Sequence, residues 1–112
     1  MSPSDLTNGE RLYLARFREG VGQKVAASWY GVGLYTYRLW EDDQEAETTS
    51  FEPPALGRIT EAEEYVIRRR RSGLTVAQVC EKMGVSRWWL RQMETGSAPI
   101  DRLRSYWEAR AA

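Results

Sequence analysis

The stretch SRWWLRQME, residues 86–94, gathers side chains that can make specific polar and apolar contacts. Arg87 and Arg91 are four residues apart, and so are Trp88 and Gln92, a spacing that stacks side chains along one line of a helix. Arginine can donate to the two acceptors of guanine, and glutamine can pair with the edge of adenine. A tryptophan ring can press on thymine methyl groups or sugars, or anchor a protein interface. These residues therefore predict a surface that recognises either DNA or a protein partner.

The composition argues against an enzyme or a metal centre. The chain has no histidine and one cysteine, Cys80, which excludes an intrachain disulfide, a histidine-based or cysteine-rich zinc site and a triad built on imidazole. No carboxylate cluster falls on a single helix face. We therefore expect no enzymatic activity, no cofactor, no metal and no small-molecule substrate.

The charges balance over the whole chain but not along it. The 112 residues include 16 basic and 16 acidic side chains, and residues 58–112 hold eleven basic against seven acidic ones. No stretch approaches the roughly 18 apolar residues of a membrane-spanning helix, and the polar N-terminus is unlike a signal peptide. With its single cysteine, the chain is expected to be a cytoplasmic protein without membrane contact.

The chain repeats itself at an interval of 53 residues, which aligns residues 6–43 with residues 59–96 without a gap. Apolar residues coincide at several positions, and nine residues are identical. The identical pairs are Thr7/Thr60, Glu10/Glu63, Arg16/Arg69, Arg18/Arg71, Gly20/Gly73, Gly31/Gly84, Val32/Val85, Arg38/Arg91 and Glu41/Glu94. We interpret the two segments as copies of one structural unit.

The first helix of each copy has a start signal and a stop signal. Thr7 and Thr60 each precede a glutamate by three residues, forming the S/T-x-x-E capping box of a helix N-terminus. Gly20 and Gly73 can end these helices, because glycine adopts the left-handed conformation at a C-terminus.

Two shorter helices are expected to follow in each copy. The second covers residues 23–30 or 76–83, and the third covers residues 34–41 or 87–94. A glycine, a valine and a small capping residue separate them in both copies. Helix, glycine, apolar residue, cap and helix is the sequence form of a helix-turn-helix.

The remaining segments connect and close these units. Residues 44–58 are acidic and contain two adjacent prolines, so no long helix is expected there, although Phe51 and Leu56 can pack onto a neighbour. A first-turn Pro99 and apolar residues at helical spacing predict a closing helix over residues 99–109. The sequence thus predicts an all-α fold. We expect a first unit (1–43), a linker (44–58) and a second unit with a C-terminal helix (59–112). The two units are expected to be truncated tandem copies that are packed together or joined through this linker.

Both copies resemble the helix-turn-helix domain of Cro and related phage repressors, whose pattern is roughly G-L-T-Q-x-x-[LV]-A-x-x-L-G-V-S-x-x-T-[IV]-x-x-[WL]-E. The first copy matches it at Gly20, Gln23, Ala27, Gly31, Val32, Thr36, Trp40 and Glu41, and the second at Gly73, Leu74, Thr75, Gly84, Val85, Ser86 and Glu94. The resemblance covers about two thirds of the chain. It implies an ion pair between the first and third helices, Arg16 with Glu41 and Arg69 with Glu94.

The resemblance also assigns roles in the second copy. Leu90 and Met93 match inward-facing positions, and Cys80 falls at a small core position. Trp89 is expected to fill the gap between the second and third helices. The residues that relatives project into the major groove of double-stranded DNA correspond to Arg87, Trp88 and Gln92. The expected DNA-binding set of this copy is Ser86, Arg87, Trp88, Arg91 and Gln92, with a protein contact as the alternative for Trp88 and a solvated helix face as the alternative for the arginines.

The first copy is more apolar on the corresponding face. Leu34, Tyr35 and Leu39 can dock on the second unit, on another subunit or on a protein partner, and we favour docking. The alternative is weak contact with DNA phosphates and sugars through Gln23, Lys24, Tyr35 and Arg38.

Two functions follow as hypotheses. The first is a sequence-specific DNA-binding transcription regulator, repressor-like and of phage or mobile-element type, whose second unit reads the major groove. The alternative is a protein-interaction module or inhibitor that reuses the helix-turn-helix scaffold.

Overall fold

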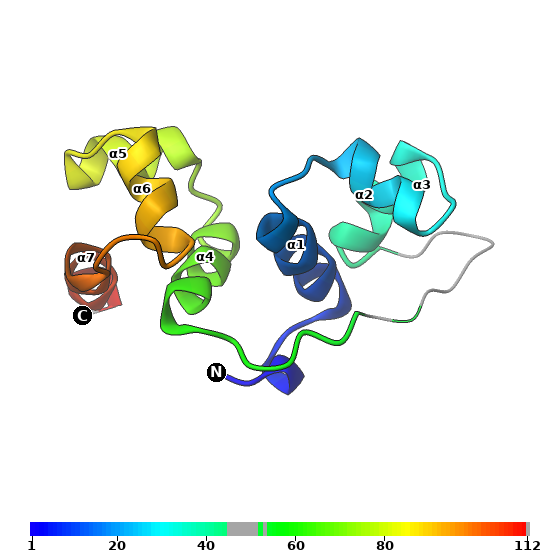
Figure 1. Cartoon of the computed structure of the whole chain (residues 1–112), viewed down its shortest axis with the longest axis horizontal. Helices are drawn as coiled ribbons and strands as arrows, with labels where there is room; N and C mark the ends of the chain where they lie inside the picture. The colour runs from blue at the N-terminus through cyan, green and yellow to red at the C-terminus, as the bar shows by residue number, and fades with distance from the viewer. Residues whose placement is uncertain (45–51, 53, 112) are drawn as a thin grey trace. The chain divides into compact units, whose positions relative to one another are not determined.

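The computed structural model describes residues 1–44, 52 and 54–111. The regular elements of these residues are all helices, so the predicted all-α fold is confirmed (Figure 1). A short 3-10 turn, Pro3–Asp5, precedes α1 (Asn8–Glu19), α2 (Gln23–Trp29), α3 (Leu34–Glu41), α4 (Glu61–Arg71), α5 (Val76–Met83), α6 (Arg87–Glu94) and α7 (Asp101–Ala111). Contacts divide the chain into two compact units, which we call unit 1 (Met1–Ile59) and unit 2 (Thr60–Ala112). None of the described helices is both long and apolar enough to cross a membrane.

Unit 1 is a three-helix arrangement around an aromatic core. The Thr7 side chain accepts from the Glu10 backbone N–H at the start of α1, and Gly20, at φ 67°, ends the helix, so both expected signals are confirmed. The buried core consists of Leu12, Ala26, Ala27, Tyr37 and Trp40. Leu56 is buried as well, whereas Phe51 lies outside the described residues.

The N-terminus of α1 receives a second cap from the residues that follow α3. Asp43 accepts hydrogen bonds from the Gly9 backbone N–H at 2.8 Å and from the Thr7 hydroxyl at 2.6 Å. Gly9 approaches α3 so closely that a Cβ there would overlap the carbonyl oxygen of Glu41. The Asp43 carboxylate therefore joins the residues after α3 to the start of α1, and only a residue without a side chain fits at position 9.

Unit 2 has the same three helices and a fourth. The caps at Thr60 and Ser86 start α4 and α6, and Thr75 with Gln78 forms a further capping box at the start of α5. Gly84, in the left-handed conformation at φ 69°, ends α5. The core of this unit consists of Tyr65, Val79, Cys80, Leu90, Met93, Leu103 and Trp107. Cys80 is thus a core residue, as predicted.

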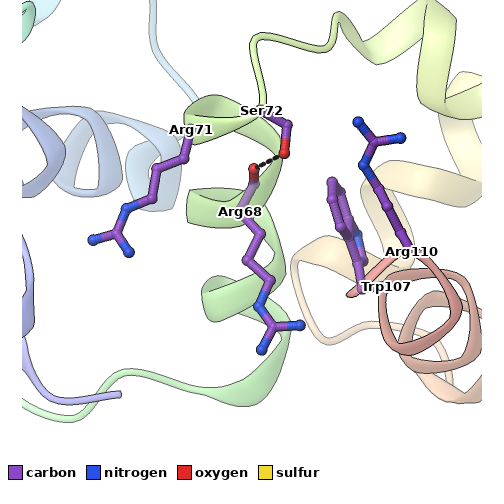
Figure 2. A pocket seen from close by; sticks show the side chains of 5 residues that line it. All are labelled: Arg68, Arg71, Ser72, Trp107 and Arg110. Atoms are coloured by element: carbon purple, nitrogen blue, oxygen red, sulfur yellow. Dashed lines mark hydrogen bonds between the residues drawn. The ribbon is translucent and has the colours of Figure 1, made fainter. Parts of the chain in front are cut away.

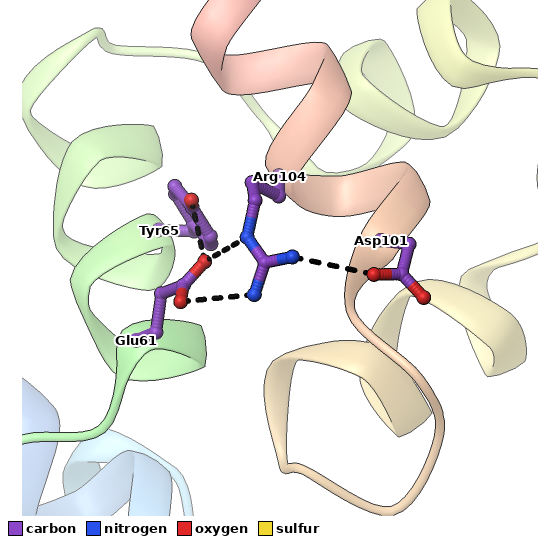
Figure 3. Close-up of polar contacts among 4 residues, drawn as sticks. All are labelled: Glu61, Tyr65, Asp101 and Arg104. Carbon is purple, nitrogen blue, oxygen red and sulfur yellow. Dashed lines mark hydrogen bonds and ion pairs between the residues drawn. The ribbon is translucent and has the colours of Figure 1, made fainter.

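The closing helix α7 packs on α4 and is held there by a polar cluster (Figure 3). Glu61 accepts from Arg104 at 2.6 Å and 3.1 Å, and it also accepts from the Tyr65 hydroxyl at 2.8 Å. Hydrogen bonds from Arg104 hold the pKa of Glu61 below its ordinary value. The helix begins at Asp101, so the expectation of Pro99 in its first turn is wrong. The helix ladder starts from the Ile100 carbonyl, which accepts from the Arg104 N–H, and this leaves Pro99 in the preceding loop.

Candidate nucleic-acid interface

Helix α6 has one buried face and one exposed face. Leu90 and Met93 are buried in the core of unit 2, as the resemblance implied. On the other side Arg87, Trp88 and Arg91 are exposed, and Gln92 is partly exposed. Trp88 exposes 63% of its surface, which is unusual for an indole in a small domain. We call Arg87, Trp88, Arg91 and Gln92 the α6 ridge.

Ser86 fixes where the ridge begins. Its hydroxyl oxygen accepts from the Trp89 backbone N–H at 3.1 Å, which caps the first turn of α6. The remaining first-turn N–H groups of α6 point out of the helix end next to Arg87, where the helix dipole favours an anion. Both features suit the end of a helix that approaches a phosphate backbone.

Trp89 does not fill the gap between α5 and α6, so that expectation is wrong. The side chain is 49% exposed and meets the Trp88 ring edge-on, with 5.2 Å between centroids. The apolar residues that α5 and α6 bury in the core of unit 2 are Val79, Cys80, Leu90 and Met93. Trp89 instead borders a hollow of about 330 Å³, which is also lined by Val85, Met93, Pro99, Asp101 and Arg102.

A buried ion pair holds α6 against α4. The Arg69 guanidinium donates from Nε to Glu94 Oε2 at 3.0 Å and from Nη2 to Glu94 Oε1 at 3.3 Å. Both side chains are more than nine-tenths buried. This pair was expected from the resemblance and is confirmed. Because it fixes the C-terminal end of α6 to the first helix of the unit, it sets the direction in which the ridge points.

The equivalent pair in unit 1 belongs to a longer chain of hydrogen bonds. Arg16 donates to both carboxylate oxygens of Glu41, at 2.9 Å and 2.8 Å, which confirms the second expected pair. Gln23 donates to Glu41 at 3.2 Å and accepts from Arg38 at 3.1 Å. Burial alone would raise the pKa of Glu41, but the hydrogen bonds from Arg16 and its neighbours lower it below the ordinary value.

This network distinguishes unit 1 from unit 2. In unit 1 the amide nitrogen and the amide oxygen of Gln23 are both engaged within the unit, and so is Nε of Arg38. The residue of unit 2 that corresponds to Gln23 in the repeat is Val76, which has no amide. The unit 1 network therefore has no counterpart that starts from this position in unit 2.

The outer face of unit 1 is largely apolar. Tyr35 on α3 is 76% exposed, Lys24 is exposed, and Leu34 and Leu39 are partly buried. Sequence reasoning missed two further exposed residues on α2, Val25 and Trp29. Their four-residue spacing on one helix line was the available signal.

One comparison with known proteins concerns the helices of unit 2. A family model described as a helix-turn-helix domain matches residues 67–111, from within α4 to the end of α7. No curated protein and no solved structure gives a significant match to the chain. A helix-turn-helix domain is typical of DNA-binding regulators. The match therefore supports a DNA partner for the unit that carries the α6 ridge.

Within the described ranges, no group of three or more histidine, cysteine, aspartate or glutamate side chains is arranged to hold a metal ion. The described carboxylates named above are engaged in caps and ion pairs. The polar groups of the α6 ridge are hydrogen-bond donors and acceptors of the kind that read base edges.

Proposed function

We propose that the protein is a sequence-specific DNA-binding transcription regulator, repressor-like and of phage or mobile-element type. In this proposal α6 of unit 2 enters the major groove of double-stranded DNA. Arg87 and Gln92 pair with base edges, Trp88 presses on thymine methyl groups or sugars, and Arg91 and Ser86 lie toward the backbone. The observation that carries the proposal is an outward-facing ridge of these residue types within the segment that matches a helix-turn-helix domain.

The charge distribution supports the proposal that unit 2, rather than unit 1, makes the main contacts with DNA. Residues 60–112 carry ten basic and seven acidic side chains, and residues 1–59 carry six basic and nine acidic ones. Since duplex DNA is a dense array of negative charge, the basic unit has the more favourable encounter with it. We propose that unit 1 contributes at most weak phosphate and sugar contacts through Gln23, Lys24, Tyr35 and Arg38.

The tandem organisation belongs to the same proposal. We infer two repeated helix-turn-helix units, at residues 1–43 and 59–112, joined by a linker at 44–58. Unit 1 then serves mainly for docking on a second copy of the chain or on a protein partner, through Leu34, Tyr35 and Leu39.

A second candidate function is a protein-interaction module. The observation that favours it is the number of large apolar side chains on the surface of unit 1: Tyr35 is 76% exposed, Val25 48% and Trp29 47%. Large exposed aromatic residues are common anchors of protein interfaces.

Paired substitutions separate the two functions. Arg87→Ala with Gln92→Ala removes the base-reading groups, and Trp29→Ala with Tyr35→Ala removes the apolar surface of unit 1. DNA reading predicts that the first pair abolishes preference among random duplexes while the second leaves it within about threefold. A protein-interaction module predicts the reverse ranking, measured as capture of a partner from lysate, with no enrichment of any duplex by the unsubstituted protein.

A further inference from the structure

The hollow beside Trp89 lies in unit 2 and has an apolar lining with a charged edge. Its lining residues come from the turn between α5 and α6, from α6, and from the start of α7 with the loop before it: Val85, Trp89, Met93, Pro99, Asp101 and Arg102. The volume of about 330 Å³ is at the small end of the range of ligand sites, roughly 300–1,000 Å³, and suits a molecule of one or two rings.

The apolar part of this lining favours a flat, aromatic ligand. Met93 is buried whereas Trp89 and Pro99 are exposed, so Met93 lies deeper in the hollow than the other two. A thioether and an indole both make favourable contacts with an aromatic ring. A ring that enters would also cover part of the exposed surface of Trp89 and remove it from water.

Arg102 brings a positive charge to one end of the hollow. Its Nη2 donates to the carbonyl oxygen of Met83 at 3.0 Å, which holds the guanidinium beside the end of α5. Val85, which lines the hollow, follows Met83 by two residues. The ion pairs found among the described residues do not include Arg102, so this guanidinium has no carboxylate partner in that part of the chain. An arginine that is held through one nitrogen can donate its other N–H groups to an anion.

The carboxylate on the same edge of the hollow is engaged elsewhere. Asp101 accepts from Arg104 at 3.3 Å (Figure 3). Adjacent residues of a helix are rotated by about 100°, so the side chains of Asp101 and Arg102 leave α7 in different directions. One reaches Arg104 and the other reaches Met83. The charge at the Val85 end of the hollow is therefore positive, and it complements an anion.

We propose that the hollow lined by Trp89, Met93 and Arg102 binds a small aromatic anion, a molecule with one or two flat rings and one carboxylate. The rings occupy the apolar part beside Trp89 and Met93, and the carboxylate accepts from the Arg102 guanidinium. This ligand site is argued from its own lining and charge, and it does not depend on the proposed reading of DNA.

The test uses the full chain and three probes that share one ring system and differ in charge. They are naphthylacetate, naphthylacetamide and naphthylethylamine, which carry a negative charge, no charge and a positive charge at neutral pH. NMR at constant ionic strength follows the side-chain signals of Val85, Trp89 and Met93. The indole N–H of Trp107, which does not line this hollow, is the internal control.

Naphthylacetate should give saturable shifts at the lining residues and should bind about threefold to fivefold more tightly than the neutral amide, as expected for one exposed ionic contact. The amine should bind more weakly than the amide. Arg102→Gln should abolish the preference for the acetate over the amide. The matched control, Arg110→Gln, removes a charge from the same helix at a residue outside this hollow and should leave the preference unchanged.

Two further variants test the ring contact and the sign of the charge. Trp89→Ala should weaken all three probes by at least about threefold, read from Val85 and Met93. Asp101→Asn should leave the binding of naphthylacetate unchanged or make it tighter, because it removes a like charge from the edge. Thermal unfolding checks that each variant is folded, and Arg102→Met replaces Arg102→Gln if that variant is not.

The outcomes separate the site from nonspecific binding. Saturable binding of naphthylacetate with a preference that depends on Arg102 supports the proposal. Equal binding of the three probes, a preference that survives Arg102→Gln, or a loss of binding in Asp101→Asn overturns the anionic ligand. Shifts at Trp107 as large as those at the lining residues overturn the site, and so does the absence of saturable shifts up to about 10 mM probe. None of these results bears on the proposed function, since no duplex is present.

Discussion

Arg69 and Glu94, 25 residues apart in the chain, form a two-point ion pair in which Nε of the arginine lies 3.0 Å from a carboxylate oxygen. Arg16 and Glu41 stand in the same relationship in unit 1, at the same separation. Each pair joins the first helix of a unit to the last turn of the third. Because the third helix of unit 2 carries the α6 ridge, the Arg69–Glu94 pair orients the surface that is proposed to read DNA.

Breaking the Arg69–Glu94 pair should strongly destabilise unit 2. Glu94→Gln leaves a buried guanidinium without its counter-charge, so the free energy of unfolding should fall by about 3 kcal/mol or more. Urea unfolding followed by the NMR signal of Leu90 measures this. As a control, Arg69→Met with Glu94→Leu should recover most of the loss, because an apolar pair has no charge to compensate. A loss of less than about 1 kcal/mol in Glu94→Gln would contradict a structural role for the pair.

Acid should weaken unit 1 through Glu41. Its pKa is lowered from the ordinary 4.5, so its contribution to stability is present above that pH and is lost as the pH falls toward the lower pKa of the folded state. Glu41→Gln is less stable at neutral pH but lacks this titration, so its free energy of unfolding should vary less below about pH 5. Urea unfolding at a series of pH values, read from the NMR signals of Leu12 and Tyr37, tests this. Parallel pH profiles for the two proteins would refute it.

Gly9 should tolerate no side chain, whereas its repeat partner Ala62 has one. Gly9→Ala places a methyl group against the Glu41 carbonyl and the Asp43 cap. The resulting shift should cost unit 1 about 2 kcal/mol or more. The matched change in unit 2, Ala62→Gly, should cost only about 1 kcal/mol, from backbone entropy and a lost buried methyl. Thermal unfolding of both variants provides the comparison, and equal losses would argue against the close approach of Gly9 to α3.

The two tryptophans of α6 should differ in binding but not in stability. Both are about half exposed or more, so Trp88→Ala and Trp89→Ala should each change the free energy of unfolding by less than about 1 kcal/mol. Trp88→Ala should weaken duplex binding about tenfold, since this ring belongs to the α6 ridge. Trp89→Ala should weaken it less than threefold. Fluorescence anisotropy with a labelled duplex measures both, and a larger effect from Trp89 would move the contact surface toward the hollow beside it.

Local signals in the sequence were enough to predict where the helices lie and which residues form most of the core. Capping residues and glycines marked the helix ends at Thr7, Gly20 and Gly84, because they act through neighbouring backbone groups. The spacing of 25 residues shared by both copies located the buried ion pairs. The Thr75 capping box was also readable, since Gln78 stands three residues later, but it was missed.

Features that depend on packing between distant residues were not readable. The pattern predicts Trp89 in the core, but in the structure Cys80 and Leu90 are core residues and Trp89 is half exposed. The Asp43 cap on Gly9 joins residues 34 positions apart and has no local signature. A hollow lined by Arg68, Trp107 and Arg110 combines residues of α4 and α7, which pack together although they are distant in the chain (Figure 2).

Selection of bound fragments from random duplex DNA at two salt concentrations tests the central claim most directly. If α6 reads the major groove, one sequence motif should be enriched at both concentrations, and the affinity for it should fall steeply with salt as phosphate contacts release counterions. The Arg87→Ala and Gln92→Ala double variant should lose the motif while keeping residual, salt-sensitive binding. Recovery of no motif at either concentration, or a motif whose affinity is independent of salt, would contradict DNA reading by the α6 ridge.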